Sequence, residues 1–227
     1  MGHPPGPRQL ALALGHAESL SREDFLSGPC NAAALALVDR WPDWPGRVAA
    51  LIGPEGAGKS HLAAIWADLA GARFLAARAV DTARLPAALS TGALVLEDAE
   101  PGGIDERALF HLFNMVREQE GYLLITARTA PAAWRLRVND LASRLRAVPA
   151  VELAPPDDAL LRAVTVKLFA DRQVAVDESL VTYLATRVER SFAAIRSVVA
   201  ELDREALRLQ RPVTRALAAE ILGRREP

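Results

Sequence analysis

A glycine-rich segment with a single lysine is the part of the sequence best suited to chemistry. Residues 53–60 read GPEGAGKS and fit the pattern G-x-x-x-x-G-K-[ST]. In this pattern the glycines let the backbone wrap around phosphate oxygens and point its N–H groups inward, and the start of the following helix adds positive potential. The lysine reaches the terminal phosphates and the hydroxyl ligates Mg²⁺. The segment therefore predicts a phosphate-binding P-loop in which Lys59 and Ser60 have these roles.

Two adjacent carboxylates are the second candidate for chemistry. Residues 94–98 read LVLED, an apolar run that closes with Glu97 and Asp98. A buried strand that ends in acidic residues can hold the Mg²⁺ shell and polarise an attacking water molecule. We expect Glu97 to serve the metal together with Ser60, and Asp98 to serve the water, so both acids are candidate catalytic residues. The alternative is a solvated strand end without a catalytic role.

Two weaker signals follow further along the chain. Thr126–Arg128 (TAR) ends another apolar run, where a polar residue can contact the γ-phosphate or the water. Residues 139–148 (NDLASRLRAV) place Arg144 and Arg146 near the end of an expected helix. Either arginine could act in trans on a neighbour's nucleotide by stabilising the charge of the transferring phosphoryl group. The alternatives are an ordinary turn for the first signal and a surface arginine for the second.

Apolar strands that alternate with helices must position these residues. Strands are predicted at Arg47–Ile52, Phe74–Ala76, Ala93–Leu96, Tyr122–Thr126 and Val148–Leu153. Helices are predicted before the first strand at 31–40, with Asn31 as the N-cap, and between strands at 59–70 and 105–119. This alternation favours a parallel sheet covered on both faces, which is an α/β fold.

The pattern changes after Pro155 and Pro156. Only helical periodicity remains, at residues 157–172, 177–188, 192–210 and 214–222, the last with Thr214 as its N-cap. We therefore predict a nucleotide-binding α/β domain at 21–155 and a small helical domain at 156–227. A Pro- and Gly-rich segment, residues 1–20, is expected to be flexible.

Composition limits the classes of function. The chain has 227 residues with a net charge of −1 and no extended basic run, which gives no support for bulk nucleic-acid binding. Its one cysteine, Cys30, excludes an internal disulfide and suits a reducing compartment. No apolar run has the length of a membrane span. We predict a cytoplasmic protein that is not anchored to a membrane.

The motifs together resemble those of the AAA+ ATPases of the DnaA clade. The segments GPEGAGKSHL, LVLED, FNMVREQEGYLLIT and NDLASRL occur in that family's order, and the resemblance runs from about Gln9 to Gly223. It implies an AAA+ P-loop NTPase with a five-stranded parallel sheet, followed by a small all-helical lid. It also implies ADP or ATP with Mg²⁺ as the bound cofactor.

The family's roles carry over onto matching positions. The resemblance places the nucleotide's phosphates on Gly53, Pro54, Glu55, Gly56, Ala57, Gly58, Lys59, Ser60 and His61. Phe25 and Asn31 resemble the segment that covers the adenine base, and Arg144 matches the arginine finger.

Three positions depart from the family's pattern. Glu97 replaces the usual aspartate, Arg128 occupies a cofactor-contacting sensor position that is usually aspartate, and Ala193 aligns with the lid's sensor arginine. Arg190 and Arg196 lie nearby but not at that position. These departures favour a nucleotide held as a conformational switch over self-sufficient hydrolysis.

Within the clade, the chain resembles regulators that inactivate DnaA. The DNA-binding domain that follows the lid in DnaA is expected to be absent, and Gln9, Leu10, Leu12 and Leu14 resemble a motif that binds the sliding clamp, the β subunit of DNA polymerase III. The resemblance implies the clamp and DnaA as partners and no sequence-specific DNA binding, and it leaves a homo-oligomer open. One alternative is an autonomous ATPase such as a helicase loader. A small-molecule phosphotransferase is disfavoured, because no acceptor site is apparent.

Overall fold

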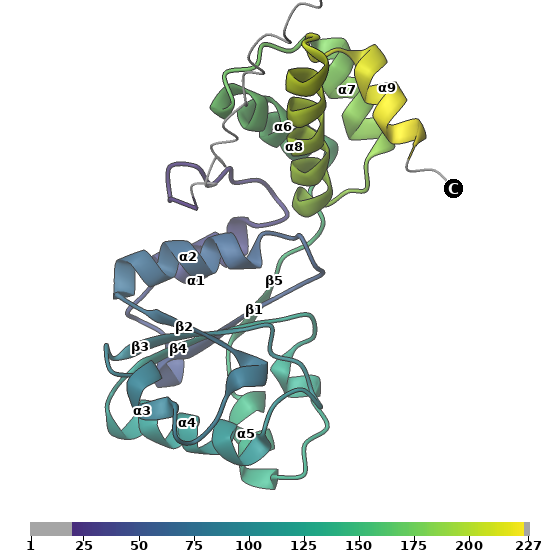
Figure 1. Cartoon of the computed structure of the whole chain (residues 1–227). Coiled ribbons are helices and arrows are strands. Elements are labelled where there is room, and N and C mark those ends of the chain that lie inside the picture. The colour runs from purple at the N-terminus through teal and green to yellow at the C-terminus, as the bar shows by residue number, and fades with distance from the viewer. Residues whose placement is uncertain (1–19, 225–227) are drawn as a thin grey trace, which may run out of the picture.

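A computed structural model describes residues 20–224, in which a sheet with helices on both faces is followed by a helical region (Figure 1). The strands are β1 (Val48–Ile52), β2 (Arg73–Ala76), β3 (Ala93–Glu97), β4 (Tyr122–Ala127) and β5 (Ala150–Glu152). They form a five-stranded sheet in the order β2-β3-β4-β1-β5, and every pairing is parallel. The predicted fold class is therefore confirmed.

Helices cover both faces of the sheet. On one side lie α1 (Ala32–Asp39) and α2 (Lys59–Ala70), and on the other lie α3 (Leu85–Ala88), α4 (Glu106–Glu118) and α5 (Asn139–Arg146). The helical region contains α6 (Asp158–Asp171), α7 (Glu178–Arg187), α8 (Phe192–Leu209) and α9 (Arg215–Gly223). Short 3₁₀ turns occur at Pro45–Arg47, Ala77–Ala79 and Pro131–Ala133. The helix α3 was not expected from the sequence.

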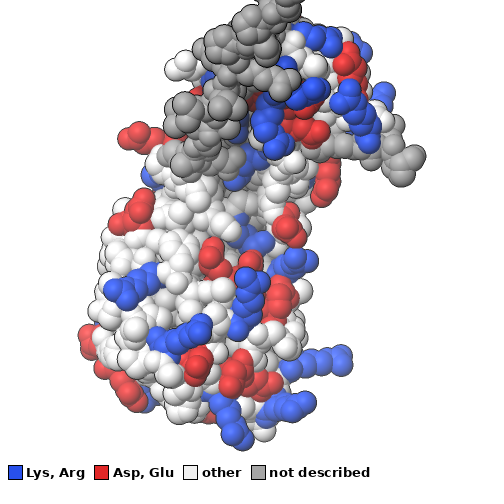
Figure 2. All heavy atoms as spheres, in the orientation of Figure 1, with Lys and Arg blue, Asp and Glu red and all other residues white. Residues whose placement is uncertain are grey.

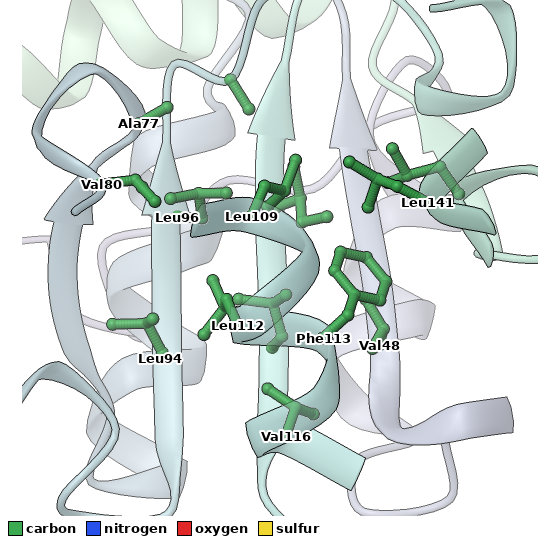
Figure 3. Close-up of a cluster of buried hydrophobic side chains, with 14 of the residues drawn as sticks. Val48, Ala77, Val80, Leu94, Leu96, Leu109, Leu112, Phe113, Val116 and Leu141 are labelled. Carbon is green, nitrogen blue, oxygen red and sulfur yellow. The ribbon is translucent and has the colours of Figure 1, made fainter. Parts of the chain in front are cut away.

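The central strands β1, β3 and β4 are apolar along nearly their whole length because both of their faces are buried, whereas the edge strands β2 and β5 are partly exposed. In β3, Leu94 and Leu96 pack with α4, whereas Ala93 and Val95 pack in a second core with α2. Figure 3 shows the first of these clusters, in which the apolar face of α4 packs against the strands. The apolar face of this helix, formed by Leu109, Leu112, Phe113 and Val116, is buried.

Capping side chains set where several helices begin. The carboxylate of Asp105 accepts hydrogen bonds from the backbone N–H groups of Arg107 and Ala108 at the start of α4. Thr214 caps α9 as predicted, because its hydroxyl accepts from the N–H of Leu217. A separate apolar core of side chains from α6, α7, α8 and α9 holds the helical region together.

Asn31 occupies the N-cap position of α1 but does not cap it with its side chain. Its Oδ1 accepts from the N–H of Gly28 at 2.8 Å, and its Nδ2 donates to the carbonyl of Leu26 at 3.1 Å. The amide instead fixes the shape of the segment that precedes the helix. The capping role expected from the sequence is therefore wrong, because these local backbone partners compete for the side chain.

Parallel strands bring the candidate chemical residues to one edge of the sheet. The P-loop follows β1, Asp98 follows β3 and Arg128 follows β4, and these strands lie in the order β3-β4-β1. Ligand sites in such sheets form outside the carboxyl ends of the strands. Within residues 20–224, no helix is long and apolar enough to cross a membrane.

Candidate functional site

The P-loop depends on glycines whose backbone angles other residues rarely adopt. The φ angles of Gly53, Gly56 and Gly58 are +148°, +73° and +96°. These angles turn the chain sharply between β1 and α2, so that the first backbone N–H groups of α2 face the space above the loop. Such groups have no partner within their helix and can bind an anion.

Gly53 is the most constrained of these glycines, and its replacement provides a test of the loop's shape. A Cβ at Gly53 would lie 2.4 Å from the carbonyl oxygen of Leu153, which belongs to the backbone and cannot move aside. We expect Gly53→Ala to lower the free energy of unfolding by about 2–4 kcal/mol, measured by chemical denaturation. Gly71→Ala is the matched control, because Gly71 also has a positive φ but nothing within 4 Å. An equal loss in both variants would contradict the close-contact explanation.

Lys59 is shielded from water and held by the loop itself. Its side chain is buried, and its Nζ donates to the carbonyls of Gly53 and Pro54, both at 2.8 Å. Burial lowers the pKa of Lys59, while the negative charge of Asp98 acts in the opposite direction. An ammonium group already removed from water and held only by neutral carbonyls gains strongly from a phosphate.

A cavity of about 590 Å³ lies over the P-loop. Its lining comes from the loop, the ends of β3 and β4, and the start of α8: Leu20, Glu55, Gly56, Gly58, Lys59, Ser60, His61, Asp98, Glu100, Arg128, Ala193 and Arg196. This one space is thus lined by a lysine, a hydroxyl, the start of a helix with its N–H groups, and a carboxylate. This set can bind a phosphate chain together with a divalent cation.

Of the two adjacent carboxylates, Asp98 lines this cavity and Glu97 does not. Asp98 has a φ of +52°, and its N–H donates to the hydroxyl of Thr126 at 3.1 Å. Thr126 is buried, and its hydroxyl holds Asp98 in place rather than lining the cavity over the P-loop. Glu97 is half-buried, and burial, followed by the charge of Asp98, raises its pKa. The structure therefore brings Asp98, rather than Glu97, together with Ser60.

The donor chemistry at this place suits Mg²⁺. The hydroxyl of Ser60 and the carboxylate of Asp98 are oxygen ligands of the kind that this cation prefers, with phosphate oxygens and water completing its shell. Among the described residues, no group of three or more His, Cys, Asp or Glu side chains could hold a metal by itself. A cation here would thus bind together with a phosphate ligand.

Arg128 lies at the rim of the cavity. Its Nη2 pairs with the carboxylate of Glu55 at 3.0 Å, and both side chains are mostly exposed. Its backbone N–H donates to Glu100, which ties the loop after β4 to the loop after β3. An exposed ion pair of this kind contributes little to stability, so Arg128 can exchange Glu55 for a phosphate.

A second cavity, of about 270 Å³, adjoins the first and is more apolar. It is lined by the segment before α1, by α6 and by the start of α8: Leu20, Asp24, Phe25, Leu26, Asn31, Gly58, His61, Val164, Lys167, Leu168, Asp171, Arg172, Phe192 and Arg196. The ring of Phe25 meets that of His61 edge-on, with centroids 5.1 Å apart. Nε2 of His61 lies 2.9 Å from the carbonyl oxygen of Ser21, and burial lowers the pKa of His61. Phe25, Asn31 and His61 thus come together at this cavity.

The start of α8 packs directly on the P-loop. The N–H of Phe192 donates to the carbonyl of Gly56 at 3.0 Å, and a Cβ added at Gly56 would lie 2.8 Å from Cβ of Ala193. Arg196, one helical turn beyond Ala193, lines both cavities. The sequence placed Arg196 near the lid's sensor position but did not show that it reaches the cavities. The spacing of three residues between Ala193 and Arg196 places both on the same face of α8, and this spacing could have indicated from the sequence that Arg196 lies near the P-loop.

Solved structures with this architecture include several DNA-associated proteins. Domain III of the Thermotoga maritima replication initiation protein DnaA has a TM-score of 0.74 and 19% identity, covering 92% of this chain and 98% of that one. AMPPCP-bound DnaA from Aquifex aeolicus has a TM-score of 0.67 and 16% identity, covering 82% and 65%. The Thermotoga maritima RuvB Holliday junction branch migration motor has a TM-score of 0.71 and 15% identity, covering 89% and 70%. The chain therefore shares the AAA+ fold of these proteins, a five-stranded parallel sheet with helices on both faces and a helical region at its C-terminal end. No protein-family model matches the chain.

In this AAA+ fold, Arg144 lies away from both cavities. Its Nη1 donates to Oδ1 of Asn114 at 2.7 Å, and its guanidinium lies 4.7 Å from the ring centroid of Phe110. A weaker contact joins it to Asp140 within the same helix. Arg146 is exposed. Two anchors on α4 therefore hold Arg144 in a defined direction.

The residues expected to bind the clamp, Gln9, Leu10, Leu12 and Leu14, lie outside the described residues. On the face drawn in Figure 2, acidic and basic side chains are interspersed. That face offers no broad basic surface, in keeping with the net charge of −1.

Proposed function

We propose that this chain is an AAA+ protein that binds ADP or ATP with Mg²⁺ at the P-loop. The observation that carries the proposal is the meeting of two unlike cavities at Gly58 and His61. One is lined by the cation, hydroxyl and carboxylate that a phosphate chain requires, and the other by apolar side chains that suit a nucleobase. Two solved DnaA structures with this fold carry AMPPCP, an adenine nucleotide analogue, which supports the same class of ligand here.

We further propose that the chain regulates the initiation of chromosome replication, in the manner of Hda, the regulatory inactivator of DnaA. It would bind the sliding clamp through Gln9–Leu14 and present Arg144 to ATP held by DnaA, which would promote hydrolysis there. The position of Arg144, outside the two cavities at the P-loop and anchored by Asn114 and Phe110, supports an action on a neighbouring site. The clamp-binding part rests on the sequence motif alone.

Clamp binding has a direct test. Replacing Gln9 and Leu10 together with alanine should reduce capture of purified sliding clamp by the full chain by about 10-fold or more, because a short peptide motif concentrates its affinity in a few anchors. Arg8→Ala, which precedes the motif, is the matched control and should leave capture unchanged. Clamp binding that persists in the double variant would remove the anchor of the regulator proposal.

An autonomous ATPase, such as a helicase loader, is the second candidate function. It is favoured by Arg196, which brings a lid arginine to the cavity over the P-loop although Ala193 occupies the expected position. Steady ATP hydrolysis by the isolated chain, lost in Arg196→Ala, would favour this function. Negligible turnover without DnaA and the clamp would favour the regulator.

A further inference from the structure

Lys167 on α6 occupies an unusual place for one of only two lysines in the chain. Its Nζ lies 2.7 Å from Oδ1 of Asp24 and 2.7 Å from Oδ2 of Asp171. All three side chains line the apolar cavity proposed above for the nucleobase. They form a charged wall of a space that also has leucine, valine and phenylalanine side chains in its lining.

The contact between Asp24 and Lys167 joins two segments that line this cavity. Asp24 belongs to the segment before α1, whereas Lys167 belongs to the helical region. Among ion pairs whose partners both lie in residues 20–224, this one alone joins the part of the chain before residue 155 to the part after it. Its two side chains are 27% and 24% exposed, so water screens the pair only partly.

The segment that carries Asp24 is itself well positioned. The hydroxyl of Ser21 donates to Oδ2 of Asp24 at 2.8 Å, which orients the carboxylate. Arg22 pairs with Asp39 on α1, and Phe25 packs against His61. These contacts connect the segment at the base cavity with α1 and with the beginning of α2.

We propose that Asp24 and Lys167 form a latch that closes the base cavity over a bound nucleoside, with both as positioning residues. This inference rests on the proposed binding of an adenine nucleotide. A base inside the cavity would contact the segment before α1 on one side and α6 on the other. The latch holds these two walls together and slows the escape of the nucleoside.

Asp171 makes the latch reversible. It lies one turn beyond Lys167 on the same helix, so it keeps its contact when Asp24 moves away. Opening therefore leaves no unpaired ammonium in a half-buried position. Burial alone would lower the pKa of Lys167, but the hydrogen bonds that its ammonium donates to Asp171 and Asp24 outweigh burial and raise the pKa overall. Lys167 thus stays charged at neutral pH.

The test compares the two carboxylates that share this lysine. ADP affinity and dissociation rate are measured on the full chain, with inorganic pyrophosphate as a probe that has phosphates but no base. Asp24→Asn, which removes the contact across the cavity, should raise the Kd for ADP by about 3- to 10-fold and speed dissociation by a similar factor. The Kd for pyrophosphate should not change. Asp171→Asn, which removes only the contact within α6, should raise the Kd for ADP by a smaller factor than Asp24→Asn does, because the contact between the two walls remains.

Further variants separate the latch from a general loss of structure. Lys167→Met should weaken ADP binding as Asp24→Asn does, and Lys167→Arg should restore most of it, with thermal melts to check folding. If Asp24→Asn does not fold, Lys167→Met and Lys167→Arg decide alone. An equal loss with Asp171→Asn, or an equal loss for pyrophosphate, would overturn the latch. Failure of the unaltered chain to bind ADP would instead overturn the proposed function.

Discussion

The Lys59→Ala variant should lose nucleotide binding, with a Kd for ADP or ATP about 100-fold higher than that of the unaltered chain. The reason lies in the state of the ammonium group before a ligand arrives. It is buried and held by two carbonyl groups of the loop, so little solvation is lost when a phosphate binds. Isothermal titration calorimetry on the purified chain measures this change.

Glu55→Gln is the matched control for this prediction. Glu55 belongs to the same loop, but it is mostly exposed and pairs only with Arg128 at the rim. Its replacement should change the Kd by less than about 3-fold, because an exposed ion pair contributes little. Unchanged binding by Lys59→Ala, with an intact fold by circular dichroism, would show that Gly53–Ser60 is not the phosphate site.

The Arg144→Ala variant should lose its effect on DnaA. We expect the stimulation of DnaA-bound ATP hydrolysis to fall by about 10³-fold or more, the range found when an arginine supplied in trans is removed. The side chain is held by Asn114 and Phe110, so that it reaches a partner in a fixed direction. The assay combines ATP-loaded DnaA, sliding clamp on DNA and the full chain.

Arg146→Ala separates the two arginines that the sequence could not. Arg146 lies two positions further along α5 and is exposed. Its replacement should leave stimulation unchanged if Arg144 is the working residue. The loss of the Asn114 and Phe110 contacts in Arg144→Ala should lower stability by only about 1–2 kcal/mol, so the variant stays folded for the assay. Full stimulation by Arg144→Ala would contradict the proposed mechanism.

Much of the fold could be predicted from local patterns. The sequence located all five strands and both long helices that flank the P-loop sheet, α2 and α4, because a buried parallel strand is apolar along its whole length and an amphipathic helix repeats its apolar face. It missed α3, a single turn too short for periodicity to reveal. The prediction that the side chain of Asn31 caps α1 was wrong, because several nearby backbone groups compete for a side-chain amide.

The sequence by itself determined the P-loop, because the glycines that permit its backbone angles, the lysine and the hydroxyl all stand within eight consecutive residues, 53–60. The tertiary structure decided which acid faces the loop. The hydroxyl of Thr126 on the neighbouring strand accepts a hydrogen bond from the N–H of Asp98, which has a positive φ. The side chain of Asp98 therefore does not follow the alternation of side chains along β3 that positions Glu97. The tertiary structure also decided where a base would lie. That cavity joins Asp24, Lys167 and Arg196, which are far apart in the chain, and only the packing of the helical region on the sheet domain brings them together.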